Sequence, residues 1–172
     1  MKRGSVLIVE DNPTENMLIR SAFEDLGVTE RVYAVDDGDE AIAFLRRKGK
    51  YADCEKYVFP TFLLTDLNMP RVNGFELLLF LKRSHFTIIP TIVLTMSADP
   101  DDVKCAYLFG ANAYHVKTPG MEGLHEQLRR IYEYWTTLEL PGTDDYGRLL
   151  ATDCSGKLSE RVGHPVLITG YE

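Results

Sequence analysis

Residues 61–70 read Thr-Phe-Leu-Leu-Thr-Asp-Leu-Asn-Met-Pro, a mostly apolar run that stops at a carboxylate. A continuous apolar run of this length is typical of a buried parallel strand. Pro70 and the pair Asn73-Gly74 then predict a turn, after which the apolar pattern resumes at Phe75. In open α/β sheets, ligands bind outside the carboxyl ends of the strands. Asp66 is therefore expected where such a fold does its chemistry, although many aspartates at this kind of position only start a turn.

Strands and helices alternate outward from this stretch in both directions. Buried or half-buried strands are predicted at 6–9, 31–35, 61–65, 91–95 and 113–116. Each is followed by a helix start with a capping residue or an early proline, at Asn12, Asp37, Asn73, Asp99 and Thr118-Pro119. The last helix is expected to run to about residue 138. Right-handed crossovers then give an α/β fold, a doubly wound five-stranded parallel sheet with helices on both faces.

Length and composition indicate a single globular domain with an appendage. The chain has 172 residues, of which 45% are hydrophobic, enough for one ordinary core. The alternation ends near residue 140, and Pro, Gly, Asp and Ser dominate afterwards. We expect a domain at 1–140 and a tail at 141–172 that forms no domain of its own, because about thirty residues cannot bury a core.

Charge and cysteine usage exclude several classes of protein. A formal net charge of −7 without a segregated basic face argues against nucleic-acid binding. The three cysteines are scattered and lack CxxC spacing, which favours free thiols over disulfides or zinc. The first apolar run covers only Val6 to Val9, too short for a signal peptide or a membrane span. A soluble, cytoplasmic protein is expected.

Polar residues gather where four of the predicted strands end. Strands one, three, four and five all finish at the same edge of such a sheet, and their last residues are Glu10-Asp11, Asp66, Thr95 and Lys117. Three carboxylates at one place repel each other unless a cation lies among them, and hard oxygen ligands suit Mg²⁺ or Mn²⁺ better than zinc. A lysine and a hydroxyl beside them match the needs of a transferred phosphoryl group. Each residue alone has an ordinary structural explanation, but their coincidence at one edge indicates a site at which Asp66 is the nucleophile.

With these residues in view, the chain resembles the receiver domain of two-component response regulators over residues 5 to about 138. The motif positions, in the family's order, are Glu10, Asp11, Asp66, Met69, Pro70, Gly74, Thr95 and Lys117. Tyr114, three residues before the lysine, matches the family's switch aromatic. The resemblance implies a flavodoxin-like (βα)5 fold with strand order 2-1-3-4-5.

The resemblance also implies a role for each motif residue. Asp66 would accept a phosphoryl group from a phosphohistidine of a partner kinase. Mg²⁺ would be bound by Asp11, Asp66 and the backbone carbonyl of Asn68, with Glu10 acting largely through water. The remaining roles fall to residues of the last two strands: Lys117 and Thr95 would hold phosphoryl oxygens, and Thr95 and Tyr114 would act as the switch.

Two regions are similar to those of receiver-only regulators that accompany phytochrome-type sensor kinases: the long loop at 50–60 and the ending at 131–141. The residue after the lysine departs from the family's pattern. Proline usually follows the lysine directly, through a cis bond, whereas Thr118 intervenes here and Pro119 comes one residue later. Either Lys117-Thr118 is a cis non-proline bond, which costs about 3 kcal/mol, or the loop takes another shape.

The function expected is a stand-alone, Mg²⁺-dependent phosphoacceptor switch that is not an enzyme in the ordinary sense, although it would catalyse its own phosphotransfer and slow autodephosphorylation. A small aspartyl-phosphate phosphohydrolase is the competing class, but those enzymes usually carry a second Asp where this chain has Asn68. A phosphorelay intermediate, which passes its phosphoryl group to a histidine phosphotransfer protein, also stays open. Intact Asp66, Lys117 and Asp11 argue against a phosphorylation-silent interaction module.

The partners expected are a sensor histidine kinase and a second copy of the chain. Receiver-only regulators resembling this one pair through the fourth helix, fifth strand and fifth helix. An apolar stripe on the last helix supports such a contact, although part of it must pack on the sheet. The stripe consists of Leu124, Leu128, Ile131, Trp135 and Leu138.

Overall fold

The computed structural model describes residues 4–28 and 31–150. Residues 4–28 and 31–140 cover nearly all of the expected domain. The expected tail is followed only to residue 150, and its remainder, including Cys154, lies outside the described residues.

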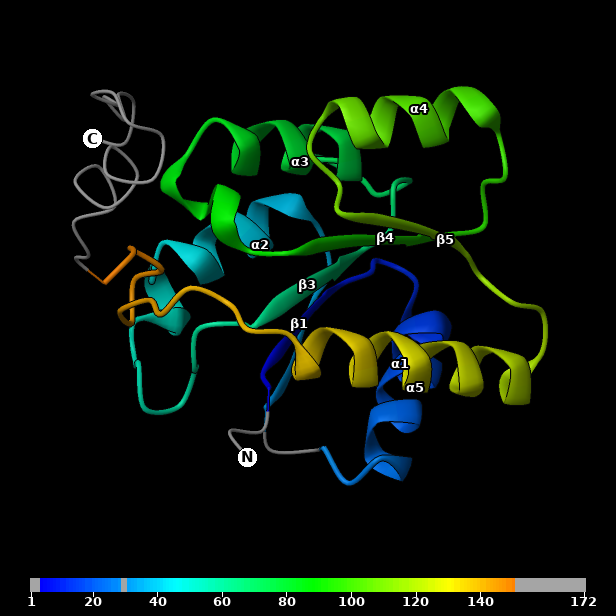
Figure 1. Cartoon of the computed structure of the whole chain (residues 1–172), viewed down its shortest axis with the longest axis horizontal. Helices are drawn as coiled ribbons and strands as arrows, with labels where there is room; N and C mark the ends of the chain where they lie inside the picture. Colours follow the sequence, from blue (N-terminus) through cyan, green and yellow to red (C-terminus); the bar gives the residue numbers. More distant parts are fainter. Residues whose placement is uncertain (1–3, 29–30, 151–172) are drawn as a thin grey trace, which may run out of the picture.

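Five parallel strands form one sheet in the order β2-β1-β3-β4-β5 (Figure 1). The strands are β1 (Val6–Val9), β2 (Val32–Val35), β3 (Phe62–Thr65), β4 (Thr91–Thr95) and β5 (Ala113–Val116). The three central strands are fully buried, which explains their continuous apolar sequences. The predicted α/β, doubly wound sheet with order 2-1-3-4-5 is confirmed.

Five helices connect or follow the strands. They are α1 (Pro13–Asp25), α2 (Gly38–Leu45), α3 (Gly74–Lys82), α4 (Pro100–Leu108) and α5 (Met121–Thr137). Four begin at the predicted caps; the Asn12 side chain, for example, accepts hydrogen bonds from the backbone of Thr14 and Glu15. The fifth begins at Met121, two residues later than Pro119, because Gly120 with φ of 81° leads into it.

The helices cover both faces of the sheet: α1 and α5 lie on one face and α2, α3 and α4 on the other (Figure 1). Under α1 and α5 the core joins Phe23, Phe62 and Leu128, each essentially inaccessible to solvent. Tyr132, which the stripe on the last helix left out, belongs to this core, because its ring packs edge-on against Phe23 at 5.8 Å. Three members of the stripe are buried here (Leu124, Leu128 and Ile131), and Trp135 packs against them.

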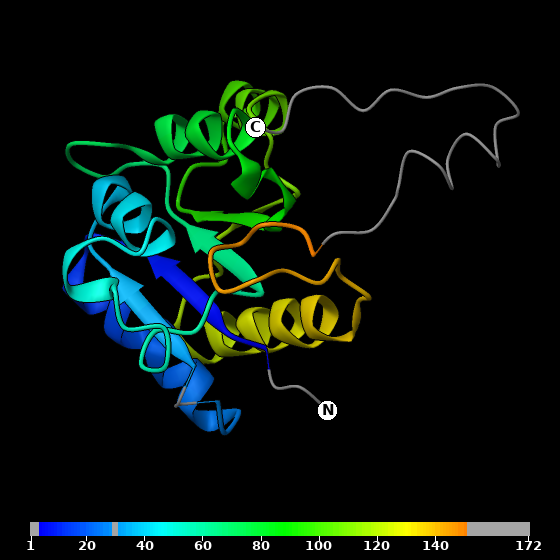
Figure 2. The same cartoon turned by 90° about the vertical axis from the view of Figure 1, so that its left-hand side faces the viewer.

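A short hairpin follows α5 and lies against the loop that precedes β3 (Figure 2). Thr143 and Leu149 form an antiparallel bridge, and Leu150 N–H donates to the carbonyl of Gly142 at 2.9 Å. The buried Arg47 guanidinium donates from Nε to the carbonyl of Asp145 at 2.9 Å and from a second nitrogen to the carbonyl of Tyr57. The hairpin therefore sits at the amino-terminal edge of the sheet, opposite the strand ends that carry the candidate site.

Two further features bear on the expectations from sequence. No cis peptide bond occurs among the described residues, so the loop after Lys117 takes the other shape that the sequence allowed. Within 4–28 and 31–150, no helix is long and apolar enough to cross a lipid bilayer.

Candidate functional site

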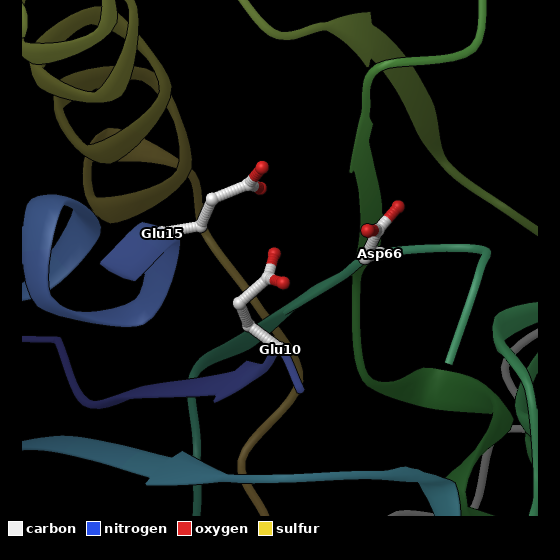
Figure 3. A group of neighbouring side chains, drawn as sticks. All are labelled: Glu10, Glu15 and Asp66. Atoms are coloured by element: carbon white, nitrogen blue, oxygen red, sulfur yellow. The ribbon is translucent and has the colours of Figure 1, made fainter. Parts of the chain in front are cut away.

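Three carboxylates gather at the carboxyl ends of the central strands. The sheet register pairs Val9 with Thr65, so that the next residues, Glu10 and Asp66, lie side by side. Glu15, in the first turn of α1, extends toward them (Figure 3). One oxygen of each side chain lies within 4.8 Å of an oxygen of the other two. The site is thus built by two strand ends and a helix start that follows one of them.

The ammonium of Lys117 lies among these carboxylates. Its Nζ is 2.7 Å from Glu10 Oε2 and 3.6 Å from Asp66 Oδ2, and it also pairs with Glu15. The lysine side chain is only 5% exposed and that of Glu10 only 2%. Lys117 therefore hydrogen-bonds two carboxylates and approaches the third without a hydrogen bond to it.

Burial and charge shift the pKa values of this group. Burial raises the pKa of Glu10, and the attraction of Lys117 only partly offsets that rise. Burial lowers the pKa of Lys117, but its hydrogen bonds to Glu10 and Glu15 outweigh burial and leave the pKa above its ordinary value. The lysine therefore stays protonated at neutral pH and keeps a positive charge beside Asp66.

The Asp66 carboxylate is oriented by the backbone around it. Its Oδ1 accepts a hydrogen bond from the N–H of Leu67 at 2.6 Å, and its side chain is 12% exposed. The start of α3 packs directly on this turn, because Gly74 N–H donates to the Leu67 carbonyl at 3.0 Å. A Cβ at position 74 would lie 2.2 Å from the carbonyl oxygen of Asp66 and 2.7 Å from Leu67 Cα. Only glycine fits there, which gives the glycine of the Asp66–Gly74 motif a physical reason.

Thr95 and Tyr114 lie on the two neighbouring strands. Thr95 is completely buried, and its hydroxyl oxygen accepts a weak hydrogen bond from Ser97 N–H at 3.4 Å. The Tyr114 hydroxyl donates to the Ser97 carbonyl at 3.0 Å, and Ser97 Oγ donates to Asp102 at 2.5 Å. Burial raises the pKa of the Tyr114 hydroxyl, so it remains a donor at neutral pH. Both predicted switch residues therefore contact the same loop between β4 and α4.

Two predicted ligands are placed differently from the carboxylate group. Asp11 is half-buried and lies outside the group of three; it lines a neighbouring cavity of about 850 Å³ with Asn16, Pro70 and Arg71. Asn68 is exposed on the loop after β3. The metal-binding roles of Asp11 and of the Asn68 carbonyl stay predictions.

Glu15 is a residue of this group that the sequence analysis did not identify, because an acidic residue in the first turn of a helix is also typical of an ordinary helix start. A signal for it existed: a helix that follows β1 begins at the carboxyl edge of the sheet, so an acidic residue in its first turn is near the site.

The donor set fits a small hard cation. Glu10, Glu15 and Asp66 offer only carboxylate oxygens, which Mg²⁺ and Mn²⁺ prefer, and the part of the chain described here places no cysteine or histidine among them. Their three negative charges exceed the single positive charge of Lys117. A divalent cation would balance the remainder.

Comparisons with known proteins bear on the family and the fold. Residues 6–129 match the model of the response regulator receiver domain. The probable methanogenesis regulatory protein FilR2 of Methanothrix harundinacea is 39% identical over 132 residues, which cover 76% of this chain and 82% of that protein. The phosphorylated cyanobacterial phytochrome response regulator RcpA is similar in structure, with a TM-score of 0.74, 33% identity and coverage of 81% of this chain and 99% of that one.

A third relative is the response regulator Rcp1 of Synechocystis, 30% identical over 138 residues that cover 79% of this chain and 92% of that protein. Its Mn²⁺-bound form has been solved, and it matches this chain with a TM-score of 0.71 over 81% of this chain and 99% of that one. The family model, the sequence matches and the strand order agree. The chain belongs to the family of response regulator receiver domains, and phytochrome response regulators are among its relatives.

Proposed function

We propose that this protein is a Mg²⁺-dependent phosphoacceptor that receives a phosphoryl group on Asp66 from a phosphohistidine of a sensor histidine kinase. The observation that carries the proposal is the position of Asp66 at the end of the central strand β3. It has a buried, protonated lysine 3.6 Å from one of its oxygens, and Thr95 at the end of the next strand. It is a signalling protein by its family, and autodephosphorylation would be a slow side reaction.

The chemistry assigns one task to each residue. An Asp66 carboxylate oxygen attacks phosphorus; the P–N bond of the phosphohistidine breaks, and its electron pair returns to the imidazole, which takes up a proton. Lys117 and the Thr95 hydroxyl bind oxygens of the incoming phosphoryl group. Glu10, Glu15 and Asp66 are the described carboxylates that would hold Mg²⁺, together with Asp11 and the Asn68 carbonyl if the loops carrying them close on the site. When bound, the cation neutralises phosphoryl charge.

The acceptor is tested with a small acyl phosphate donor. Parent protein should gain one phosphoryl group, visible by intact mass, in the presence of Mg²⁺ and not in the presence of a chelator. Asp66→Asn should gain none, because an amide cannot form the acyl phosphate. Asp39→Asn, an exposed aspartate in the first turn of α2, is the matched control and should label like the parent. Full labelling of Asp66→Asn would remove Asp66 from its role.

The kinase is proposed to be of the phytochrome type. RcpA and Rcp1 are the relatives that support this choice, since RcpA is a phytochrome response regulator by name. A kinase that draws its phosphate from ATP acts in the cytoplasm, which is where we place this protein. Phosphotransfer from a panel of purified histidine kinases tests the choice: preferential labelling by a kinase without a phytochrome sensor would contradict it.

We also propose a homodimer through α4, β5 and α5, the pairing that the family resemblance implied. A groove of about 700 Å³ runs between β5, an edge strand of the sheet, and α5. It is lined by Ala113, His115, Arg130, Ile131, Tyr134 and Trp135. The Tyr134 side chain is 59% exposed and stacks edge-on against Trp135 at 5.3 Å, so an aromatic pair borders the groove. Exposed apolar surface beside an open strand edge usually marks an interface.

Tyr134→Glu is the variant that tests the dimer, because Trp135 also packs on the core and its replacement would disturb folding. Sedimentation at micromolar concentration should show a dimer for the phosphorylated parent and a monomer for Tyr134→Glu. Thr137→Glu, at the exposed end of the same helix and outside the groove lining, is the control. Monomers throughout, with and without phosphoryl donor, would contradict this interface.

A further inference from the structure

The backbone on both sides of Lys117 is held by one side chain, that of Gln127 on α5. Its Oε1 accepts hydrogen bonds from Thr118 N–H at 3.0 Å and from the Thr118 hydroxyl at 3.1 Å. Its Nε2 donates to the carbonyl of Val116 at 2.8 Å. A single primary amide thus pairs with the residue before the lysine and the residue after it.

This pairing replaces a missing neighbour strand. β5 is the last strand of the sheet, and on its inner side Lys117 N–H donates to the Thr95 carbonyl at 2.8 Å. On its outer side the Val116 carbonyl and the Thr118 N–H have no strand to bond. A side-chain amide offers one acceptor and one donor in a plane, as a peptide unit does, and so satisfies both groups.

A second contact fixes the same loop to the helix. A Cβ at Gly123, one turn before Gln127, would lie 2.6 Å from the Thr118 methyl carbon. The absence of a side chain at Gly123 therefore lets Thr118 pack directly on α5. Gly123 and Gln127 together form the surface of α5 that Thr118 contacts. Thr118 occupies the position at which the family usually has proline.

We propose that Gln127 is the positioning residue for Lys117. By holding Val116 and Thr118, it fixes the direction in which the lysine leaves β5 and hence the reach of its ammonium toward Asp66. The main chain of Lys117 is then restrained on both sides. From this fixed main-chain position the side chain extends to Glu10, Glu15 and Asp66. The proposal rests on the proposed function, in which Lys117 binds the phosphoryl group carried by Asp66.

The chemical consequence concerns the rate of phosphoryl transfer and not the binding of the cation. No carboxylate of the site is on the loop after β5, so loss of Gln127 leaves the cation ligands in place. The main chain of Lys117, in contrast, is no longer held in position. Small displacements of a group that acts on the reacting atoms cost up to ~10²-fold in rate, and we expect about tenfold for Gln127→Ala.

The experiment measures phosphorylation by a small acyl phosphate in four proteins: parent, Gln127→Ala, Lys117→Ala and the double variant. Gln127→Ala should lower the rate constant of phosphorylation about tenfold. It should leave the Mg²⁺ dissociation constant within about twofold of the parent, because no cation ligand is moved. In the Lys117→Ala background the same change should have no further effect, because Gln127 acts through the lysine. Glu122→Ala, an exposed change in the first turn of α5, should behave like the parent.

A direct readout accompanies the rates. The Thr118 amide proton should exchange with solvent faster in Gln127→Ala than in the parent, and Thr118→Val, which removes only the hydroxyl, should show a smaller loss of rate. If Gln127→Ala does not fold, Thr118→Val and its combination with Lys117→Ala provide the same comparison.

The outcomes separate the two proposals. If Lys117→Ala is phosphorylated slowly but Gln127→Ala is phosphorylated at the parent rate, the role of Gln127 is overturned and the role of the lysine is not. An equal slowing by Gln127→Ala in both backgrounds also overturns it, because a general structural effect does not need the lysine. A parent-like rate in Lys117→Ala overturns the proposed role of the lysine, and the role of Gln127 with it.

Discussion

The carboxylates of the site compete for the single ammonium group of Lys117. Lys117 is hydrogen-bonded to Glu10 and paired with Glu15, whereas its distance to Asp66 is 3.6 Å. The lysine therefore lies nearer to the flanking glutamates than to Asp66. A phosphoryl group on Asp66, as proposed, would add negative charge there and would draw the lysine toward it.

Replacement of Glu15 by glutamine tests whether this side chain belongs to the site. The change keeps the size of the side chain and removes one of three negative charges. Mg²⁺ affinity should fall about tenfold, equivalent to ~1.4 kcal/mol, as measured by calorimetric titration. Glu24→Gln, an exposed change on the same helix, should leave the affinity unchanged. Equal affinities in both variants would restrict Glu15 to its role at the helix start.

Substitution at Gly74 tests the close packing beneath the acceptor. The added methyl group of Gly74→Ala would meet backbone atoms of Asp66 and Leu67, which cannot move aside cheaply. We expect a loss of roughly 1–3 kcal/mol in the free energy of unfolding and slower phosphorylation, because the Asp66 turn must shift.

Gly27→Ala provides the contrast. Its backbone has φ of 68°, but a Cβ there meets nothing within 4 Å. It should cost about 1–2 kcal/mol from backbone strain alone, with unchanged phosphorylation. Urea unfolding and the labelling rate measure both effects; a Gly74→Ala protein that labels at the parent rate would show that the turn tolerates displacement.

Secondary structure elements were the most predictable level of this molecule. Apolar runs gave the central strands, and the caps Asn12, Asp37, Asn73 and Asp99 gave four of the five helix starts, because both signals are local. The hairpin after α5 was not predicted. Its position depends on Arg47, 98 residues from Asp145 in sequence, and on main-chain carbonyls that carry no sequence signal. Glu15 was missed because its partner Lys117 is 102 residues away in sequence. Gln127 was missed because two of its three partner groups are main-chain groups, of Val116 and Thr118.

Arg47 provides a test of how firmly the hairpin is bound. The guanidinium is buried and bridges two carbonyls, so Arg47→Ala leaves both without their donor. Hydrogen bonds to charged groups contribute roughly 1.5–3 kcal/mol, and we expect a loss of about 2 kcal/mol in urea unfolding. Lys48→Ala, the exposed neighbour, should lose little. Phosphorylation should continue in both, because the hairpin lies at the edge opposite the site; a strong loss would connect the two edges.

His115, half-buried on β5, makes the stability of the fold depend on pH. Burial lowers its pKa below the ordinary value of 6.5, so between the two values the unfolded chain binds more protons than the folded one. The stability contributed here is complete above pH 6.5 and is lost as the pH falls toward the lowered value. Urea unfolding from pH 5 to 8 measures this effect. The free energy of unfolding should rise with pH in both proteins, but the rise should be smaller in His115→Gln, by about the contribution of one proton. An identical slope would exclude His115 from the effect.

Three surfaces of the molecule lie at different edges of the one sheet. The carboxylates and Lys117 lie at the carboxyl edge, the hairpin lies at the amino edge, and the groove of β5 and α5 lies along one side. Gln127 is shared by two of them, because it lines the groove and holds the loop of Lys117. A second copy seated in the groove would therefore touch the side chain that positions the lysine.

Because Gln127 belongs to both surfaces, pairing of two copies and phosphorylation are expected to be coupled. If pairing favours the phosphorylated form, then phosphorylation favours pairing by the same factor, because the coupling free energy between two binding events is reciprocal. At a fixed, limiting level of acyl phosphate, the phosphorylated fraction should therefore rise as total protein increases through the dimer dissociation constant, and it should stay flat in Tyr134→Glu. The amount of the protein in a cell would then act as an input of its own, setting how much of a constant kinase signal is retained.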